Sequence, residues 1–103
     1  MHDNKKPDQH RAVFAGYVVT GFECKDASGR IGWHVTSRHS SAETGHNYWI
    51  SGRNFHAVRD SPFHYKEKRV NLVEIYEPPI TKGIEQTEQD AVLQAIATWE
   101  EAG

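Results

Sequence analysis

The chain has 103 residues, of which 37% are hydrophobic and 11% aromatic, and this composition excludes wholesale disorder and suits one small domain. It carries 12 Lys and Arg against 14 Asp and Glu, for a net charge of −2, and its single cysteine, Cys24, excludes an intramolecular disulfide. Because there is no apolar signal segment and no apolar run of membrane-spanning length, we expect a soluble cytoplasmic protein with no membrane partner.

The charges are distributed unevenly along the chain. Residues 30–73 contain seven basic and three acidic side chains, whereas residues 74–103 contain one basic and seven acidic ones. The middle of the chain is therefore mildly basic and its end clearly acidic. Protonation of histidines near about pH 6 would make the middle more basic still.

The first part of the chain predicts an arm followed by a strand. Residues 1–10 are polar and aperiodic, which indicates a flexible arm ahead of a single domain over residues 11–103. Residues 11–23 are rich in β-branched and aromatic side chains. They predict a strand, with a bulge expected at Gly16 or Gly21.

The next segment predicts a turn and a second strand, which together with the first strand make a hairpin. The turn covers residues 25–29, where Gly29 can adopt a positive φ. Residues 30–37 alternate between apolar and polar side chains, as in a half-buried strand. On this pattern one face, toward the core, carries Ile31, Trp33 and Val35, and the other, toward solvent, carries His34 and Thr36.

The middle of the chain predicts shorter strands separated by polar segments. Residues 38–45 are expected to form a polar loop, residues 46–51 a third strand, and residues 54–58 a short fourth one. A turn is expected at residues 60–62, followed by a last strand over residues 69–76 that ends before a pair of prolines.

The only helix is predicted at the C-terminus, with Thr87 as its N-cap. Its apolar residues recur at i, i+3, i+4 and i+7 and form one stripe, made of Val92, Ala95, Ile96 and Trp99. Such a stripe has to pack against another element, and one face of the sheet is the economical partner. We therefore expect an α+β fold, with a four- to five-stranded antiparallel sheet and one C-terminal helix (about 87–101) packed on one face.

The segment from Arg30 to Arg69 is the richest in side chains that make working surfaces. It interleaves aromatic rings with histidine and arginine, which are the groups that stack, donate hydrogen bonds and pair with charge. Its histidines lie five to ten residues apart, and this spacing fits no local metal-binding motif. No catalytic signature stands out either, so we expect neither a metal nor another cofactor and favour a non-enzymatic protein. A small enzyme or metal-binding protein that uses histidines stays a third hypothesis.

The second hypothesis is nucleic-acid binding through the basic aromatic segment at residues 30–69. Single-strand binders place aromatic and basic side chains together on an exposed sheet face. However, a segment of net charge +4 attached to a tail of net charge −6 supplies little attraction for phosphates over distance.

The leading hypothesis is a small binding or regulatory protein whose partner is another protein, which fits a bacterial or phage accessory or inhibitor protein. Interface residues are enriched in arginine and large aromatics, and loops on a rigid sheet commonly carry function. The candidate binding residues are Arg38, His46, Tyr48, Arg53, Phe55, His56 and Arg59. The helix face with Glu88, Glu100 and Glu101 is expected to be solvated, and the chain to be a monomer or a homodimer.

Overall fold

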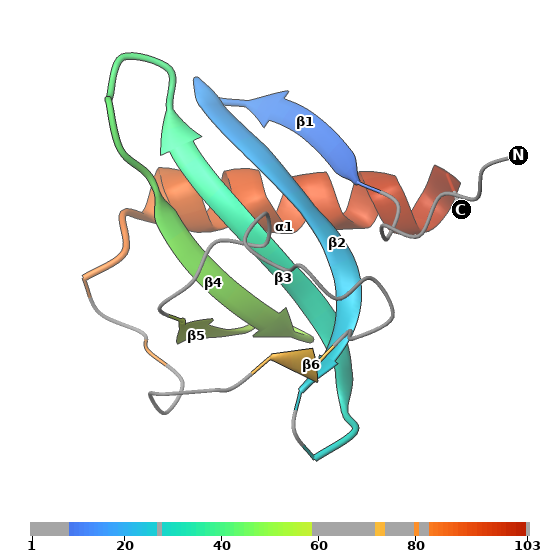
Figure 1. Cartoon of the computed structure of the whole chain (residues 1–103). Coiled ribbons are helices and arrows are strands. Elements are labelled where there is room, and N and C mark those ends of the chain that lie inside the picture. Colours follow the sequence, from blue (N-terminus) through green and yellow to red (C-terminus); the bar gives the residue numbers. More distant parts are fainter. Residues whose placement is uncertain (1–8, 27, 59–71, 74–79, 81–82, 103) are drawn as a thin grey trace, which may run out of the picture.

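An antiparallel sheet with one helix across one of its faces forms the protein, as the sequence predicted (Figure 1). The computed structural model describes residues 9–26, 28–58, 72–73, 80 and 83–102. Five strands lie in the order β1-β2-β3-β4-β5, and a sixth, β6, pairs in parallel with β2. The elements are β1 His10–Phe14, β2 Tyr17–Asp26, β3 Ile31–His39, β4 His46–Ser51, β5 Asn54–Ala57, β6 Leu72–Val73 and α1 Gln86–Ala102.

The first two strands form a tight hairpin, so the prediction of a single bulged strand over residues 11–23 is wrong. Its turn consists of Ala15 and Gly16, which both have positive φ, at 53° and 83°. A two-residue turn of this kind matches the twist of the strands on either side. The pairing of β2 runs through Gly21 without a bulge, and a Cβ there would collide with the backbone of His34 in β3.

The carboxylate of Asp26 holds the turn between β2 and β3. Its Oδ1 accepts hydrogen bonds from the N–H groups of Ser28 and Arg30, at 2.9 and 2.8 Å, and Gly29 has the expected positive φ, at 92°. Burial acts to raise the pKa of Asp26, but hydrogen bonds from Ser28 and Arg30 outweigh burial and lower it below the ordinary value. The carboxylate therefore stays ionised and stabilises the turn.

The middle strands agree with the prediction, with small changes at their ends. β3 runs two residues further than expected, so the polar loop covers residues 40–45, while β4 and β5 match the strands expected at 46–51 and 54–58. Of the strand predicted over residues 69–76, the structure describes Leu72–Val73 as β6. The rest of that strand, the turn predicted at residues 60–62 and the first eight residues of the N-terminal arm lie outside the described residues.

The helix begins one residue earlier than predicted, and its buried stripe is confirmed. The N–H of Gln89 donates to the carbonyl of Glu85 at 3.0 Å, so Glu85 is the N-cap and the expectation for Thr87 is wrong. The stripe Val92, Ala95, Ile96 and Trp99 is buried. Within the described residues, no helix is long and apolar enough to cross a membrane.

The main core lies between α1 and the sheet. Trp33 belongs to it, as predicted, with 7% of its surface exposed. The sheet contributes Val19, Trp33, Val35, Tyr48, Ile50 and Phe55, and α1 contributes its apolar stripe. Each large apolar side chain buried here stabilises the fold by about 1.5–3 kcal/mol relative to an exposed one.

The other face of the sheet, turned away from α1, is buried around His34. The expectation that His34 alternates with Trp33 is confirmed, but the expectation that it meets solvent is wrong, because it is 1% exposed. The reason is that its cross-strand neighbours on this face, Phe22 and Trp49, are themselves large and buried. They belong to a second apolar cluster, made of Phe22, Cys24, Trp49 and Val58.

Candidate functional site

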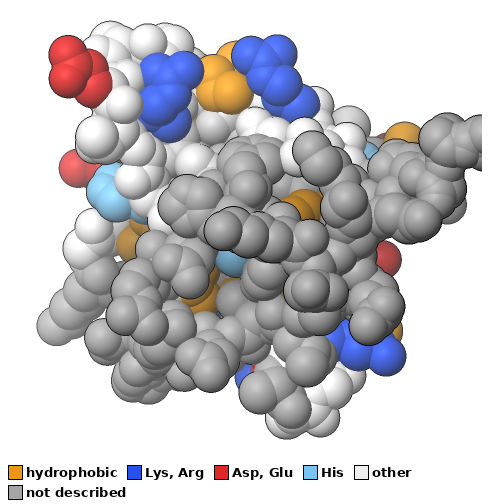
Figure 2. Space-filling model, in the orientation of Figure 1, with side chains coloured by type: hydrophobic (Ala, Val, Ile, Leu, Met, Phe, Trp, Pro, Cys, Tyr) orange, Lys and Arg blue, Asp and Glu red, His pale blue; other side chains and the backbone are white. Residues whose placement is uncertain are grey.

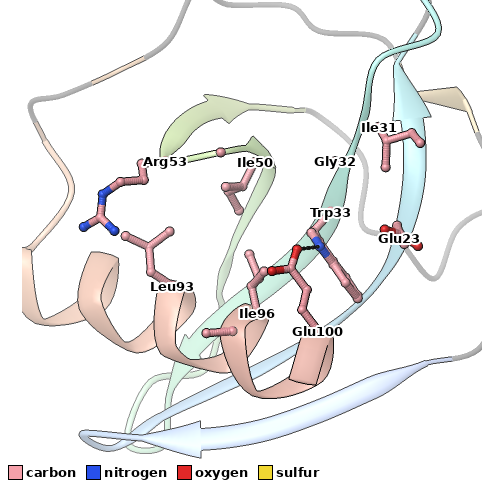
Figure 3. A pocket seen from close by; sticks show the side chains of 11 residues that line it. Glu23, Ile31, Gly32, Trp33, Ile50, Arg53, Leu93, Ile96 and Glu100 are labelled. Carbon is pink, nitrogen blue, oxygen red and sulfur yellow. Dashed lines mark hydrogen bonds between the residues drawn. The ribbon is translucent and has the colours of Figure 1, made fainter. Parts of the chain in front are cut away.

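A groove of about 260 Å³ opens between the C-terminal half of α1 and neighbouring ends of β2, β3 and β4 (Figure 3). Its walls come from both layers of the fold and combine apolar with charged side chains. The apolar lining is Ile31, Trp33, Ile50, Leu93, Ile96 and Ala97, and the charged lining is Glu23, Arg53 and Glu100, with Gly32 and Gly52 between them. We call this feature the groove.

Strand register and helical periodicity place these side chains in the groove. Across the sheet, Glu23 lies opposite Trp33 and Trp33 opposite Ile50, so the three side chains form one row on the side that faces α1. Along the helix, the lining residues are spaced i, i+3, i+4 and i+7 and share one face: Leu93, Ile96, Ala97 and Glu100. This face shares Ile96 with the buried stripe, and its other residues lie beside the stripe, at the edge of the core.

Arg53 reaches the rim of the groove from the turn between β4 and β5. Gly52 occupies the first position of this two-residue turn with a φ of 64°, a conformation that favours glycine. Arg53 is exposed, and in Figure 3 its guanidinium lies beside Leu93, on the opposite side of the groove from Glu100. The turn thus presents a cation at one end of the groove.

Two carboxylates flank the ring of Trp33 at the other end of the groove. The Nε1–H of Trp33 donates to Oε2 of Glu100 at 3.1 Å, and Glu23 lies across from Trp33 on the neighbouring strand. In the part of the chain that the structure describes, neither carboxylate forms an ion pair, and Arg53 forms none. The groove therefore presents charges of both signs that are open to a ligand.

A cluster of aromatic rings supports the floor of the groove. The His10 ring stacks on Trp99 with centroids 5.5 Å apart and meets Trp33 edge-on at 5.4 Å. Trp33 and Trp99 are themselves 5.3 Å apart. Because both indoles are nearly buried and packed on several sides, the Nε1–H of Trp33 points at Glu100 from a rigid base.

The predicted binding residues do not form one site. Arg53 lines the groove, whereas Tyr48 and Phe55 are buried in the main core with their ring centroids 5.4 Å apart. His56 is buried on the face away from α1. Arg59 lies outside the described residues. The small core takes several of its aromatic rings from residues 30–69, the segment that the sequence predicted to form a binding surface.

Arg38 and His46 lie at the end of the sheet away from the groove. Arg38 points to the face turned away from α1, and its Nη1 donates to the carbonyl of Ala42 at 2.7 Å. Figure 2 looks onto this face and shows basic side chains along its upper edge. Arg38 thus stabilises the loop after β3 through this hydrogen bond. His46 contacts Glu88 in the first turn of α1.

Glu88 is buried, so the expectation that it belongs to a solvated acidic face is wrong. It is 3% exposed, and its Oε2 lies 3.4 Å from the Tyr48 hydroxyl, which donates to it, and 3.4 Å from Nδ1 of His46. Burial, followed by the neighbouring carboxylate, raises the pKa of Tyr48 far above its usual range, so this hydroxyl stays a donor. A signal was present in the sequence, because Glu88 precedes Val92 by four residues and falls on the buried stripe.

The histidines turned away from α1 lie in an apolar setting. His34 and His56 flank Trp49 across the strands, and the His56 and Trp49 ring centroids are 5.6 Å apart. Burial raises the pKa of the nearby Cys24 thiol to about 12, which leaves it protonated. Among the described residues, no group of three or more His, Cys, Asp or Glu is arranged to hold a metal ion.

The sequence did not indicate that Glu23 and Trp33 belong to a site with Glu100. Their meeting depends on the pairing of β2 with β3 and on where α1 crosses the sheet. One signal was available: Leu93 and Ala97 are apolar and lie directly beside the buried stripe of the helix, next to Ile96.

Comparison with known proteins adds no further residue to this site. No protein-family model, curated protein or solved structure matches the chain.

Proposed function

We propose that the protein is non-enzymatic and acts by binding another protein, with a short segment of the partner seated in the groove. The observation that supports this proposal is the combination in the groove of apolar walls with charges of both signs that form no ion pair among the described residues. Protein-binding surfaces bury a few apolar anchors and surround them with polar groups that set orientation. The groove offers both on a rigid support of helix and sheet.

The size of the groove indicates how much of a partner it takes. Pockets that enclose a whole small-molecule ligand measure about 300–1,000 Å³. At about 260 Å³ the groove is smaller than these. It therefore suits one or two side chains of an extended segment, whose main chain passes along the rim.

The charges of the groove favour a protein partner over a nucleic acid. Two carboxylates and one guanidinium line it, so its formal charge is negative. Nucleic-acid sites gain their affinity from several Lys and Arg side chains that neutralise phosphates. A phosphate backbone in this groove would meet Glu23 and Glu100 as well as Arg53.

A displayed library of random dodecapeptides, selected on the full chain, tests the proposal. The recovered peptides are then measured by fluorescence polarisation against wild type, Ala97→Gln and Ala102→Gln. Both alanines are exposed on α1, but only Ala97 lines the groove. We expect Ala97→Gln, which fills the groove, to weaken binding by at least about tenfold, and Ala102→Gln to leave it unchanged.

Two results would overturn the proposal. One is that no selected peptide binds the wild-type chain, or that Ala97→Gln and Ala102→Gln bind selected peptides equally well. The other is that a labelled single-stranded oligonucleotide binds at low salt and loses affinity in Arg53→Ala, which would support the nucleic-acid hypothesis.

A further inference from the structure

The two carboxylates of the groove are placed around one indole ring. Glu23 lies opposite Trp33 in the sheet, and Trp33 donates to Oε2 of Glu100 at 3.1 Å. This hydrogen bond orients the Glu100 carboxylate and leaves Oε1 as an acceptor toward the groove. Figure 3 shows both carboxylates on the side of the groove away from Arg53. At this end of the groove, Glu100 is therefore an oriented carboxylate, and Glu23 adds a second negative charge.

The position of Glu100 on α1 adds a second source of negative potential. The C-terminal end of a helix carries partial negative charge from its unpaired carbonyl groups, and basic residues usually lie there. The last turn of α1 contains no basic residue, and it carries Glu100 and Glu101. A cation bound beside Glu100 would relieve this unfavourable arrangement.

We propose that the groove binds a lysine or arginine side chain of the partner, an inference that rests on the proposed function. The cationic head pairs with the carboxylate of Glu100, and Glu23, on the other side of the Trp33 ring, adds to the negative potential. A single basic residue supplies the charge that this end of the groove lacks.

The apolar walls suit the remainder of a long basic side chain. Ile31 is 58% exposed, one of two large hydrophobic side chains among the described residues that are this open, and it lines the groove. The methylene stems of Lys and Arg pack on such surfaces while their heads stay polar. The stem of the bound side chain therefore runs along Ile31 and Ile96 toward the carboxylates.

Arg53 sets the direction of the bound segment. Its guanidinium lies at the opposite end of the groove, beside Leu93 (Figure 3). Guanidinium groups donate several hydrogen bonds in a fixed plane, which suits main-chain carbonyls or a carboxylate. The partner segment is therefore held by its main chain near Arg53 and by its basic side chain near Glu100.

The test is a titration of the full ¹⁵N-labelled chain with two capped tripeptides, acetyl-Gly-Lys-Gly-amide and acetyl-Gly-norleucine-Gly-amide. Norleucine has the stem of lysine without its charge. The Trp33 indole N–H reports on the groove directly because it contacts Glu100. We expect the lysine peptide to shift this signal with saturation in the millimolar range, and the norleucine peptide to bind at least about tenfold more weakly.

A matched pair of variants locates the carboxylate that is responsible. Glu100→Gln removes the charge in the groove and keeps the shape, whereas Glu101→Gln removes a charge from an exposed neighbour that does not line the groove. We expect Glu100→Gln to weaken binding of the lysine peptide by about tenfold. Glu101→Gln is expected to bind this peptide within about twofold of the wild-type affinity.

The outcomes separate this inference from the proposed function. If the norleucine peptide binds as well as the lysine peptide, or if Glu100→Gln and Glu101→Gln behave alike, the basic-residue inference is overturned. If library peptides still lose affinity in Ala97→Gln, the groove binds a protein segment by contacts other than a basic side chain, and the proposed function stands. If neither the tripeptides nor the library peptides bind in the groove, both the inference and the proposed function are overturned.

Discussion

The thiol of Cys24 is expected to be almost inert while the protein is folded. Cys24 lies in the cluster on the face of the sheet turned away from α1 and is 3% exposed. Burial raises its pKa to about 12 because the apolar surroundings disfavour the thiolate. Thiol reagents react with the thiolate, so both accessibility and ionisation oppose modification.

The ionisation effect on Cys24 alone is large. At about pH 8, a pKa of about 12 leaves roughly one thiol in 10,000 ionised, whereas an ordinary cysteine with a pKa of about 8.5 has about one in four ionised. The native thiol is therefore expected to react at least about a thousandfold more slowly than the same thiol in the unfolded chain.

The assay follows the release of thionitrobenzoate from Ellman's reagent, in native buffer and in denaturing urea. An exposed control is Gln94→Cys on α1 in a Cys24→Ser background, which is expected to react at the ordinary rate without urea. If native Cys24 reacts within about tenfold of its rate in urea while the protein stays folded, the assignment of a buried, high-pKa thiol is wrong.

Two further predictions concern stability. Tyr48→Phe removes a donor to the buried Glu88 and is expected to lower the free energy of unfolding by about 1 kcal/mol in urea denaturation; an unchanged midpoint would contradict this role. Asp26→Asn is expected to destabilise the protein near neutral pH. Because the folded pKa of Asp26 is lowered, its stabilisation is complete above the ordinary value of about 3.9 and disappears as the pH falls through the folded value. Urea midpoints of the two proteins should therefore converge in acid, and a gap that stays constant with pH would refute the argument.

Local patterns predicted the elements well where one physical requirement dominated. The buried stripe of α1 follows from hydrophobic periodicity, because apolar residues spaced i, i+3, i+4 and i+7 share one face of a helix that has to be buried. Strand β4 follows from a short run of aromatic and β-branched residues, Tyr48, Trp49 and Ile50. The hairpin at Ala15 was missed because alanine gives no signal for positive φ, and Gly16 alone read equally well as a bulge.

The candidate site was predictable only in part. Arg53 was selected from its neighbourhood of aromatic and basic residues, and it does line the groove. Phe55 and His56 were selected for the same reason but lie in the interior, because chemical type does not distinguish a ring that fills the core from one that meets a partner. Glu100 was expected on a solvated face and is exposed, but its hydrogen bond to Trp33 was not predicted because the two residues lie 67 positions apart in the chain.

The sequence by itself determined the α+β class, the antiparallel sheet and the helix that covers it, because these depend on periodicity and turn residues within short stretches. Only the tertiary structure decided that the second face of the sheet is buried around His34, and that Glu23, Arg53 and Glu100 surround one groove. The physical reason is that burial and charge pairing depend on which strands and which helix turn meet in space. Residues far apart in the chain acquire a common environment only when strand register and helix placement bring them together.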